Sequence, residues 1–443
     1  MKRSDDPGSR YNPAVPAPPP VPDSRPDLDT PPDPPPVTRP RPTVAVDLRA
    51  LVPEATGIGV YTHQLLSALT DLPDAPRFVG MAHTEPRGSG PLRDAGVEID
   101  VQRVPLGAWL QQRLPLGVWW QQRVLPKRLG RGDVDLLFSP LQTLPVMRPA
   151  CPVPTVVTVH DLTVVLRPDE HRFKVRWSQL PFLERSMDRA GRIIADSRST
   201  ADDLLSQFPD ASRGKVEVIH LGVGPEYRPA DAETVAEIRR ELGAPEGYLL
   251  FVGTLEPRKN LPTLLNAWEV LRDADPDFPP LLLAGGTGWH SDKVQRRIER
   301  LTGHGVRHLG RPSDAELVRA YQGATAFAYP SLYEGFGLPV LEAMACGVPC
   351  VTADVSSLPE VVGDAGLLVN PRDVAELAAA LQRLIGEPTL AADLAARGRE
   401  RARRFTWERA ARLHAEVFSQ ALADGRAPTP DASTPDDAKS KVD

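Results

Sequence analysis

The chain has 443 residues, of which 41% are hydrophobic and 25% are charged, and its formal net charge is -6. These values indicate a globular protein of two or three domains and argue against nucleic acid as a partner. Three cysteines, Cys151, Cys346 and Cys350, are too few for a disulfide framework or a zinc cluster and suit a reducing compartment. The opening Met-Lys-Arg-Ser-Asp-Asp leads into prolines rather than an apolar signal-peptide segment, and no apolar run approaches the roughly 18 residues of a membrane helix. We therefore expect a cytoplasmic protein.

The two ends of the chain differ in composition from the rest. Fifteen of the 49 prolines lie within residues 1–42, where aromatic residues are nearly absent. Such a segment cannot bury enough apolar surface to offset the entropy lost on ordering, so we predict a disordered tail with polyproline character. Residues 425–443, rich in Pro, Asp, Ser and Lys, lead to the same prediction. Neither tail is expected to carry chemistry, and a proline-rich recognition arm is the alternative for the first.

Between these tails, short β-rich apolar runs alternate with helical patterns, which is typical of parallel α/β sheets. The expected strands are Thr43–Leu48, Phe78–Ala82, Val134–Phe138, Thr155–His160, Arg192–Asp196 and Val216–His220, then Tyr248–Val252, Leu281–Ala284, Val306–Leu309, Ala326–Tyr329 and Val348–Thr352. The expected helices include Ile58–Leu69, Asp373–Ile385, Leu390–Arg404 and an amphipathic final helix, Trp407–Leu422. A polar connection at Gly222–Asp231 separates two α/β units of similar size. Because ligands of such sheets bind at the carboxyl ends of the strands, we expect the site in a cleft between the units.

A ten-residue sequence is duplicated in tandem at residues 105–124, where Pro-Leu-Gly-Ala-Trp-Leu-Gln-Gln-Arg-Leu precedes Pro-Leu-Gly-Val-Trp-Trp-Gln-Gln-Arg-Val. The duplication is too short for a solenoid. One interpretation is that Trp109, Trp119 and Trp120, beside arginines and Lys127, form an interfacial patch for lipid or a lipid-linked acceptor. The favoured alternative is that one copy is a packed helix and the other an extended loop.

The most specific motif is Tyr-Pro-Ser-Leu-Tyr-Glu-Gly-Phe-Gly-Leu-Pro-Val-Leu-Glu-Ala-Met-Ala-Cys-Gly at residues 329–347. A strand end runs into a Gly-containing loop, Pro339 suits the first turn of a helix, and Gly347 suits its end. Free N–H groups at the start of such a helix form an anion site. Glu334 in the loop and Glu342 in the helix can accept hydrogen bonds from vicinal hydroxyls, as on a ribose or a hexose. The simpler alternative is that both are ordinary capping and surface acids.

This segment resembles the Glu–seven residues–Glu motif of the family-4 retaining glycosyltransferases, and the resemblance extends over residues 43–422. It implies the α/β GT-B fold, in which two Rossmann-like parallel-sheet domains face a cleft and the C-terminal helix packs back toward the N-terminal domain. The implied parts are the acceptor-binding domain at 43–228, the nucleotide-sugar donor domain at 229–405 and the crossover helix at 406–424.

The resemblance also assigns roles to residues of the motif. It implies that Glu342 binds the ribose of the nucleotide and that Glu334 contacts the donor sugar. Phe336, Gly337 and Leu338 match the stretch whose backbone meets the donor.

A second motif, Phe251-Val-Gly-Thr-Leu-Glu-Pro-Arg-Lys-Asn-Leu, places Arg258 and Lys259 between a strand and a helix. A pyrophosphate leaving group gains charge as the glycosidic bond breaks, and fixed cations stabilise that transition state more than the ground state. Arg258 suits bidentate binding and Lys259 acts as a point charge, whereas a solvated basic turn is the alternative. Thr254 stands where many relatives have an arginine, and the motif resembles a mannosyltransferase-rich branch. We therefore expect Lys259 to be the main phosphate ligand.

Two further signals lie in the first unit. Gly57 and Gly59 follow the first strand, where glycine lets the backbone approach a phosphate closely, and they resemble the family loop that closes over the donor phosphates. His160 and Asp161 follow the strand Thr155–His160 and are expected to project into the cleft. In the family the matching histidine lies near the reacting face of the donor sugar, so His160 is expected to bind the sugar or orient the acceptor and is not assigned as a firm general base.

Two other segments, Asp196-Ser197 and His220-Leu-Gly222, also match family positions and are interpreted as structural.

No metal and no cofactor are predicted, because no Asp-x-Asp motif follows a strand and Arg258 with Lys259 can replace the electrostatic role of an ion. The expected partners are GDP-mannose or, second, a UDP-hexose, and a glycan or lipid-linked acceptor reached by peripheral contact with the inner membrane face. The alternatives are a nucleotide-sugar hydrolase or epimerase of the same fold, a non-catalytic nucleotide-sugar-binding protein, and an NAD-dependent oxidoreductase. The incomplete glycine fingerprint counts against the last.

Overall fold

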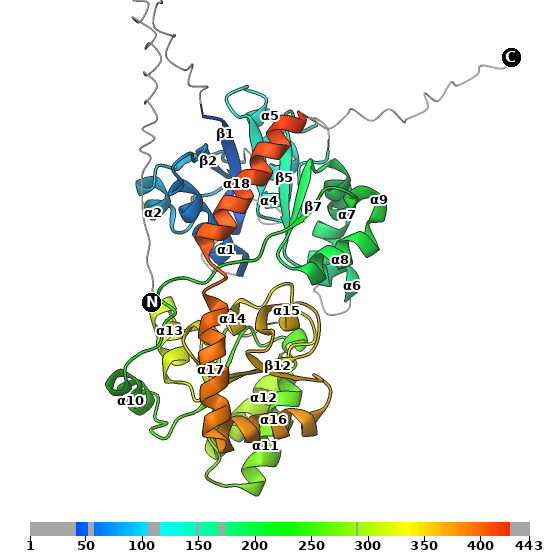
Figure 1. Ribbon diagram of the computed structural model, residues 1–443. Helices are drawn as coiled ribbons and strands as arrows, with labels where there is room; N and C mark the ends of the chain where they lie inside the picture. The colour runs from blue at the N-terminus through cyan, green and yellow to red at the C-terminus, as the bar shows by residue number, and fades with distance from the viewer. Residues whose placement is uncertain are drawn as a thin grey trace, which may run out of the picture. The chain divides into compact units, whose positions relative to one another are not determined.

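The computed structural model describes residues 41–51, 57–104, 116–147, 150–167, 173–288 and 291–425. The predictions for the two tails concern segments that lie almost entirely outside these residues, as does the first copy of the duplicated sequence. From Arg41 onward the described chain forms one compact unit that contains two sheets (Figure 1).

Both sheets pair in parallel and follow the same principle of strand order. The first has seven strands in the order β3-β2-β1-β4-β5-β6-β7, and the second has six in the order β10-β9-β8-β11-β12-β13. In each sheet the order reverses at one point, between β1 and β4 and between β8 and β11, and doubly wound sheets bind ligands at such switch points. The strands are β1 (Thr43–Asp47), β2 (Arg77–Ala82), β3 (Glu98–Val101), β4 (Leu136–Ser139), β5 (Thr155–Val159), β6 (Arg192–Ala195), β7 (Val216–Val218), β8 (Leu249–Val252), β9 (Leu281–Ala284), β10 (Val306–Gly310), β11 (Ala326–Tyr329), β12 (Cys350–Ala353) and β13 (Gly366–Val369).

Helices connect the strands, as a parallel sheet requires. They are α1 (Gly57–Thr70), α2 (Ser89–Asp94), α4 (Leu116–Arg123), α5 (Leu125–Leu129), α6 (Thr163–Leu166), α7 (Phe173–Arg189), α8 (Arg198–Gln207), α9 (Pro209–Ser212), α10 (Ala232–Glu241), α11 (Leu261–Ala274), α12 (Asp292–Leu301), α13 (Asp314–Gly323), α14 (Leu338–Ala345), α15 (Leu358–Val362), α16 (Val374–Gly386), α17 (Pro388–Ala402) and α18 (Trp407–Asp424), with 3-10 turns η1 (Leu48–Ala50), η3 (Pro257–Lys259) and η4 (Thr302–His304). None of the helices within the described residues combines the length and apolar character that crossing a bilayer requires.

The expected strands are all present, with ends that differ by a few residues, but the sequence patterns do not reveal β3 and β13. Both lie at the edge of a sheet and pair on one side only. β3 has the sequence Glu-Ile-Asp-Val and is nowhere fully buried, while β13 has only the four residues Gly-Leu-Leu-Val. An edge strand need not be continuously apolar, whereas buried parallel strands are recognised in a sequence by their continuous apolar runs.

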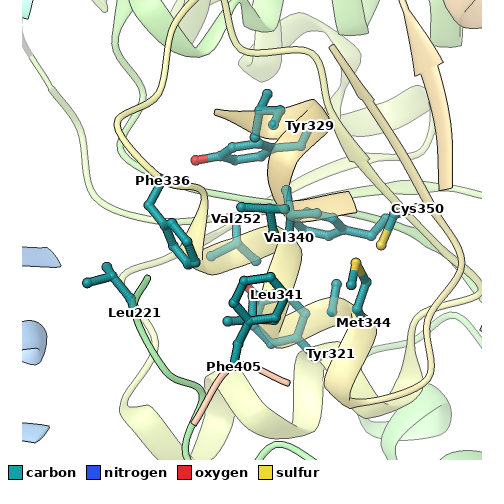
Figure 2. Close-up of a cluster of buried hydrophobic side chains, with 14 of the residues drawn as sticks. Leu221, Val252, Tyr321, Tyr329, Phe336, Val340, Leu341, Met344, Cys350 and Phe405 are labelled. Atoms are coloured by element: carbon teal, nitrogen blue, oxygen red, sulfur yellow. The ribbon is translucent and has the colours of Figure 1, made fainter. Parts of the chain in front are cut away.

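Figure 2 shows the apolar packing around α14. Val340, Leu341 and Met344 of this helix are fully buried, and each such side chain stabilises the fold by about 2 kcal/mol relative to exposure. The side chains drawn with them come from the neighbouring strands, from α13 and from connecting segments: Leu221, Val252, Tyr321, Tyr329, Phe336, Cys350 and Phe405. This packing fixes the start of α14 relative to the ends of β11 and β12.

The final helix, α18, packs against α1, β4 and β5 of the seven-stranded sheet (Figure 1). Its Phe418 ring lies 5.1 Å from the ring of Phe138 in β4, measured between centroids. The prediction that the C-terminal helix packs back toward the first unit is therefore confirmed.

The second copy of the duplicated sequence forms α4. Trp120 is fully buried, and Trp119 packs against the same core. Gln121 and Gln122 donate hydrogen bonds to the carbonyl oxygens of Thr143 (2.6 Å) and Leu144 (2.8 Å). The interpretation as a lipid-facing patch is therefore wrong for Trp120, whose ring is buried, while Trp119 is only partly buried. The packed helix is confirmed for this copy. Trp109 lies outside the described residues.

Candidate functional site

Two loops leave the six-stranded sheet at its switch point between β8 and β11. The loop after β8 contains η3, which carries Arg258 and Lys259. Asn260 follows with a left-handed backbone (φ 57°), which asparagine adopts more readily than most residues. Its side-chain amide donates to the carbonyl oxygens of Pro330 (3.0 Å) and Pro371 (2.6 Å). Asn260 thereby holds the Arg-Lys turn against the loop that follows β11.

Arg258 and Lys259 both bind the carboxylate of Glu334. Nη1 of Arg258 donates to Oε2 at 2.6 Å, and Nζ of Lys259 donates to Oε1 at 2.7 Å. Arg258 also donates to Oε1 of Glu256 through Nε (3.1 Å) and Nη2 (2.8 Å). Lys259 donates to the hydroxyl of Tyr329 at 2.5 Å. Two cations and two carboxylates thus form one formally neutral cluster in which each side chain is fixed by its neighbours.

The cluster is largely shielded from solvent, with side-chain exposures of 18% for Arg258, 9% for Lys259 and 8% for Glu334. Burial alone would raise the pKa of Glu334, but the charges of Arg258 and Lys259 outweigh it and lower that pKa to about 2. Burial, reinforced by the neighbouring Arg258, lowers the pKa of Lys259. Glu334 is therefore ionised, and the cations are ordered around it before any ligand arrives.

Two serines after β12 hold the loop that carries Glu334. The backbone N–H of Glu334 donates to Oγ of Ser356 at 2.9 Å. Oγ of Ser357 lies within hydrogen-bond distance of the carbonyl oxygens of Glu334 (3.0 Å) and Phe336 (2.6 Å). The predicted donor-binding residues Glu334 and Phe336 therefore occupy a loop whose backbone is fixed by side chains.

This loop ends at Gly337, the N-cap of α14. Its backbone has φ 115°, a conformation that is accessible to glycine and strained for other residues. The helix begins at Leu338, and the first backbone N–H groups of a helix have no acceptor within it. The predicted stretch Phe336, Gly337 and Leu338 thus lies at a helix N-terminus, which favours anions.

Glu342 lies further along α14 and is half-buried. Its Oε2 accepts a hydrogen bond of 2.8 Å from the hydroxyl of Tyr321. Burial raises the pKa of Glu342 to about 7; hydrogen bonds from Tyr321 and Tyr227 oppose this shift, and the charges of Glu226 and Asp314 add to it. The predicted ribose ligand therefore titrates near neutral pH.

His160 follows β5 and is held through both ring nitrogens. Nδ1 lies 2.7 Å from Oδ2 of Asp196, and Nε2 lies 2.7 Å from the carbonyl oxygen of Pro140. The ring of Tyr61, in α1, meets the imidazole edge-on at 4.8 Å between centroids. Asp161 turns back to accept from the backbone N–H of Thr163 at 2.9 Å. In this structure His160 is thus bound within the protein, and its contact with a sugar stays a prediction.

Gly335 brings His160 next to the Glu334 loop. A Cβ atom at Gly335 would collide with the carbonyl oxygen of His160. The hydroxyl of Thr200, in α8, lies 3.1 Å from the carbonyl oxygen of Gly335 and 3.3 Å from that of His160. The segments that follow β5 and β11 therefore meet, and the motifs that contain His160 and Glu334 lie side by side.

The two predicted glycines lie at the start of α1. Gly57 is its first residue, and a Cβ atom there would meet no atom within 4 Å. Gly59 is buried within the first turn of this helix, and Tyr61 on the same helix contacts His160. The structure thus places these glycines on the helix that borders the His160 end of the site, while their contact with donor phosphates stays a prediction.

Several residues hold the site residues in place although the sequence patterns assign them no functional role. Some lie inside the two motifs but have no role that spacing reveals, and others come from helices or loops distant in the chain. They are Asp196, Thr200, Tyr227, Glu256, Tyr321, Tyr329, Ser356 and Ser357.

Comparison with protein families gives two matches that together span most of the described chain. The model described as "Glycosyltransferase Family 4" matches residues 55–227, and the one described as "Glycosyl transferases group 1" matches residues 235–401.

Curated relatives include bacterial glycosyltransferases. O-antigen chain mannosyltransferase B of Escherichia coli is 38% identical over 256 residues, which are 57% of this chain and 67% of that protein. The serotype-specific mannosyltransferase WbdA of Escherichia coli is 28% identical over 62% of this chain, but the match spans only 34% of its length. A D-inositol 3-phosphate glycosyltransferase of Salinispora arenicola is 35% identical over 54% of this chain and 57% of its own.

Solved structures share the fold at lower identity. Sucrose-phosphate synthase of Thermosynechococcus elongatus superposes with a TM-score of 0.68 at 23% identity, covering 87% of this chain and 100% of that one. HepE of Anabaena, solved with UDP and glucose, gives 0.66 at 21% identity, covering 85% and 99%. With the two parallel sheets, these matches confirm the predicted GT-B fold.

Proposed function

Because the chain belongs to the family-4 glycosyltransferases, we propose that it transfers a hexose, with retention of configuration and without a metal, from a nucleotide-sugar donor to a glycan or lipid-linked acceptor. The observation that carries this proposal is the convergence of Arg258, Lys259 and Glu334 beside the start of α14. Glu342 lies along the same helix.

In the proposed complex, the donor diphosphate binds Arg258 and Lys259 and the N-terminus of α14, with the backbone of 336–338 alongside. The ribose hydroxyls donate to Glu342, and the hydroxyls of the sugar donate to Glu334. Both assignments use carboxylates whose environment is already ordered by protein partners, which limits the entropy lost on binding.

The start of α1, with Gly57 and Gly59, closes over the donor phosphates on the side opposite Arg258 and Lys259. We assign residues 43–228 to acceptor binding and 229–405 to donor binding. If the acceptor is lipid-linked, the protein makes peripheral contact with the membrane that carries it, and the proposal includes membrane contact for that reason alone.

The proposed reaction breaks the bond between the anomeric carbon and the phosphate oxygen and forms a bond to an acceptor oxygen on the same face. The acceptor proton passes to the departing nucleoside diphosphate, so the products are the glycoside and the nucleoside diphosphate. Arg258 and Lys259 stabilise the charge that develops on the leaving group, which is the role a divalent ion has in other transferases. No carboxylate base is needed for this step.

GDP-mannose is the donor we favour, with a UDP-hexose as the second choice. The support is the 38% identity to a protein named as a mannosyltransferase. The UDP-bound neighbour supports only the fold, because it is 21% identical.

The test is a metal-free thermal-shift panel with GDP, UDP, ADP and their sugars, on wild type and Glu342→Ala. A ligand at about 100 times its Kd adds about 2.7 kcal/mol to stability, which the assay resolves. Glu416→Ala, an exposed glutamate on α18, is the matched control. Glycoside formation from the stabilising donor is then followed by mass spectrometry, with the anomeric configuration read by NMR.

Stabilisation by one nucleotide, lost in Glu342→Ala and kept in Glu416→Ala, supports the donor site and names the base. Release of free sugar without an acceptor would favour a hydrolase, and binding without turnover would favour a nucleotide-sugar sensor. A shift produced by NAD(H) alone would sink the transferase proposal.

A further inference from the structure

The hydrogen bonds of His160 define where its protons are. Nε2 lies 2.7 Å from the carbonyl oxygen of Pro140, and a carbonyl oxygen only accepts, so Nε2 carries a proton. Nδ1 lies 2.7 Å from Oδ2 of Asp196, and two lone pairs would repel at that distance, so a proton lies between them. Whether that proton belongs to the ring or to the carboxyl group, neither ring nitrogen offers a free lone pair.

The surroundings oppose loss of the shared proton. The side chains of His160 and Asp196 are only 12% and 3% exposed. Within the described residues, Oδ1 of Asp196 is buried without a hydrogen-bond partner. Without the shared proton, Asp196 would be a buried anion with no hydrogen-bond donor to either carboxylate oxygen. Such a state is costly in free energy.

Among the described residues, the other titratable groups around the pair come from four segments. Asp161 follows β5 and adds negative charge, and His220 lies in the connection after β7. Tyr61 of α1 faces the imidazole, and His414 of α18 is neutral because burial lowers its pKa to about 4. Burial alone would lower the pKa of His160, but Asp196, the Pro140 carbonyl and Asp161 raise it above its ordinary value.

We propose that Asp196 is a positioning residue that keeps a proton on His160, so that His160 serves as a hydrogen-bond donor to the substrates and never as the base that deprotonates the acceptor. The N–H at Nε2 exchanges the Pro140 carbonyl for an oxygen of the sugar or acceptor. This inference rests on the proposed function and deepens it. If His160 cannot take the proton of the acceptor hydroxyl, the departing nucleoside diphosphate takes it.

The first test does not require activity. The full chain is labelled with 15N-histidine, and the His160 signals are assigned with His160→Gln. We expect the protonation of His160 to stay constant between about pH 6 and 8.5 in wild type. In Asp196→Asn the carboxyl group that shares the proton at Nδ1 is gone, so the ring should lose that proton within this pH range and become a weaker hydrogen-bond donor. A wild-type His160 that titrates like a free histidine would overturn the proposal.

The second test is kinetic. Asp196→Asn preserves shape, and we expect it to lower kcat at least about tenfold while the KM for the donor changes by less than about threefold. In the His160→Gln background the same substitution should have no further effect, because Asp196 acts through His160. Asp202→Asn, on the exposed side of α8, is the control.

Additive losses in the double variant would overturn the proposal and assign Asp196 a merely structural role. Absence of transfer by the wild-type protein would refute the proposed function, while the NMR result would still decide the protonation of His160.

Discussion

The hydroxyl of Tyr61 lies 2.8 Å from Nε2 of His414, although 353 positions separate the two residues in the chain. Nδ1 of His414 lies 2.8 Å from the carbonyl oxygen of Ala410, so Nδ1 carries the proton and Nε2 accepts from Tyr61. The same hydroxyl lies 2.8 Å from Oγ1 of Thr158 in β5. α1, β5 and α18 therefore share a buried hydrogen-bond network around a neutral imidazole.

This network makes stability depend on pH. Burial lowers the pKa of His414 from 6.5 to about 4, so the unfolded chain binds a proton at a higher pH than the folded chain does. The contribution to the free energy of unfolding is complete above pH 6.5 and is lost as the pH falls toward 4, with a size on the order of 3 kcal/mol. We expect the free energy of unfolding, measured with urea, to fall less steeply between pH 6.5 and 4 in His414→Gln than in wild type.

The control for this measurement is His304→Gln, since His304 is exposed in η4. It should keep the slope of wild type. Equal slopes for wild type and His414→Gln would show that His414 does not couple folding to pH.

The pKa of Glu342, about 7, predicts a pH-dependent affinity for the nucleotide. The ionised carboxylate is the better acceptor for ribose hydroxyls, so the affinity for the nucleoside diphosphate should rise as the pH increases through 7. Tyr321→Phe removes a hydrogen bond to the ionised form and should move the midpoint upward. Isothermal titration calorimetry between about pH 6 and 8.5 measures both effects.

Glu342→Gln is the corresponding control, because the amide cannot titrate. Its affinity should be weak and nearly flat with pH. A wild-type profile as flat as that of Glu342→Gln would contradict a ribose contact by this carboxylate.

Lys259→Met should impair the chemical step more than folding. The change removes the charge from the proposed leaving-group site while Arg258 continues to neutralise Glu334. Loss of one such group from a shielded site lowers kcat by about a hundredfold or more. Single-turnover rates at saturating donor provide the measurement, and Lys293→Met on the exposed face of α12 is the matched control. A rate within about threefold of wild type would remove Lys259 from the proposed mechanism.

Gly335→Ala should uncouple the Glu334 loop from His160. The added methyl group would collide with the carbonyl oxygen of His160, and overpacking of this kind costs about 1–3 kcal/mol. We expect a lower melting temperature and a loss of transfer of at least about tenfold. At Gly386, the last residue of α16, a Cβ atom would meet nothing within 4 Å. Gly386→Ala should therefore match wild type, and equal behaviour of the two variants would refute the close approach at Gly335.

Sequence patterns predicted the parts of the site that depend on local order. Arg258 and Lys259 directly follow Pro257 in the loop after β8, and Gly337 with Pro339 marks the start of α14, so each signal is contained in a few consecutive residues. The buried strands were found for the same reason, because both their faces are apolar.

The partners of these residues could not be predicted in the same way. Tyr321 reaches Glu342 because of how α13 packs beside α14, and Thr200 reaches Gly335 because two distant chain segments meet. Asp196 was interpreted as structural, since no spacing reveals that β5 and β6 are neighbours and place it against His160. Such pairs depend on sheet order and helix rotation, which are set by packing over the whole unit.

α18 packs against the seven-stranded sheet, although it lies far along the chain from the strands of that sheet. It begins at Trp407, 189 positions after β7 ends at Val218. At 5–20 residues per second, a ribosome needs roughly 10–40 s to cover that stretch. During this time the seven-stranded sheet lacks α18, so the apolar surface around Phe138 stays uncovered. The six-stranded sheet can fold before α18 is synthesised. The nascent chain is thus most exposed to aggregation or to chaperones in its earlier half, and that half matures last.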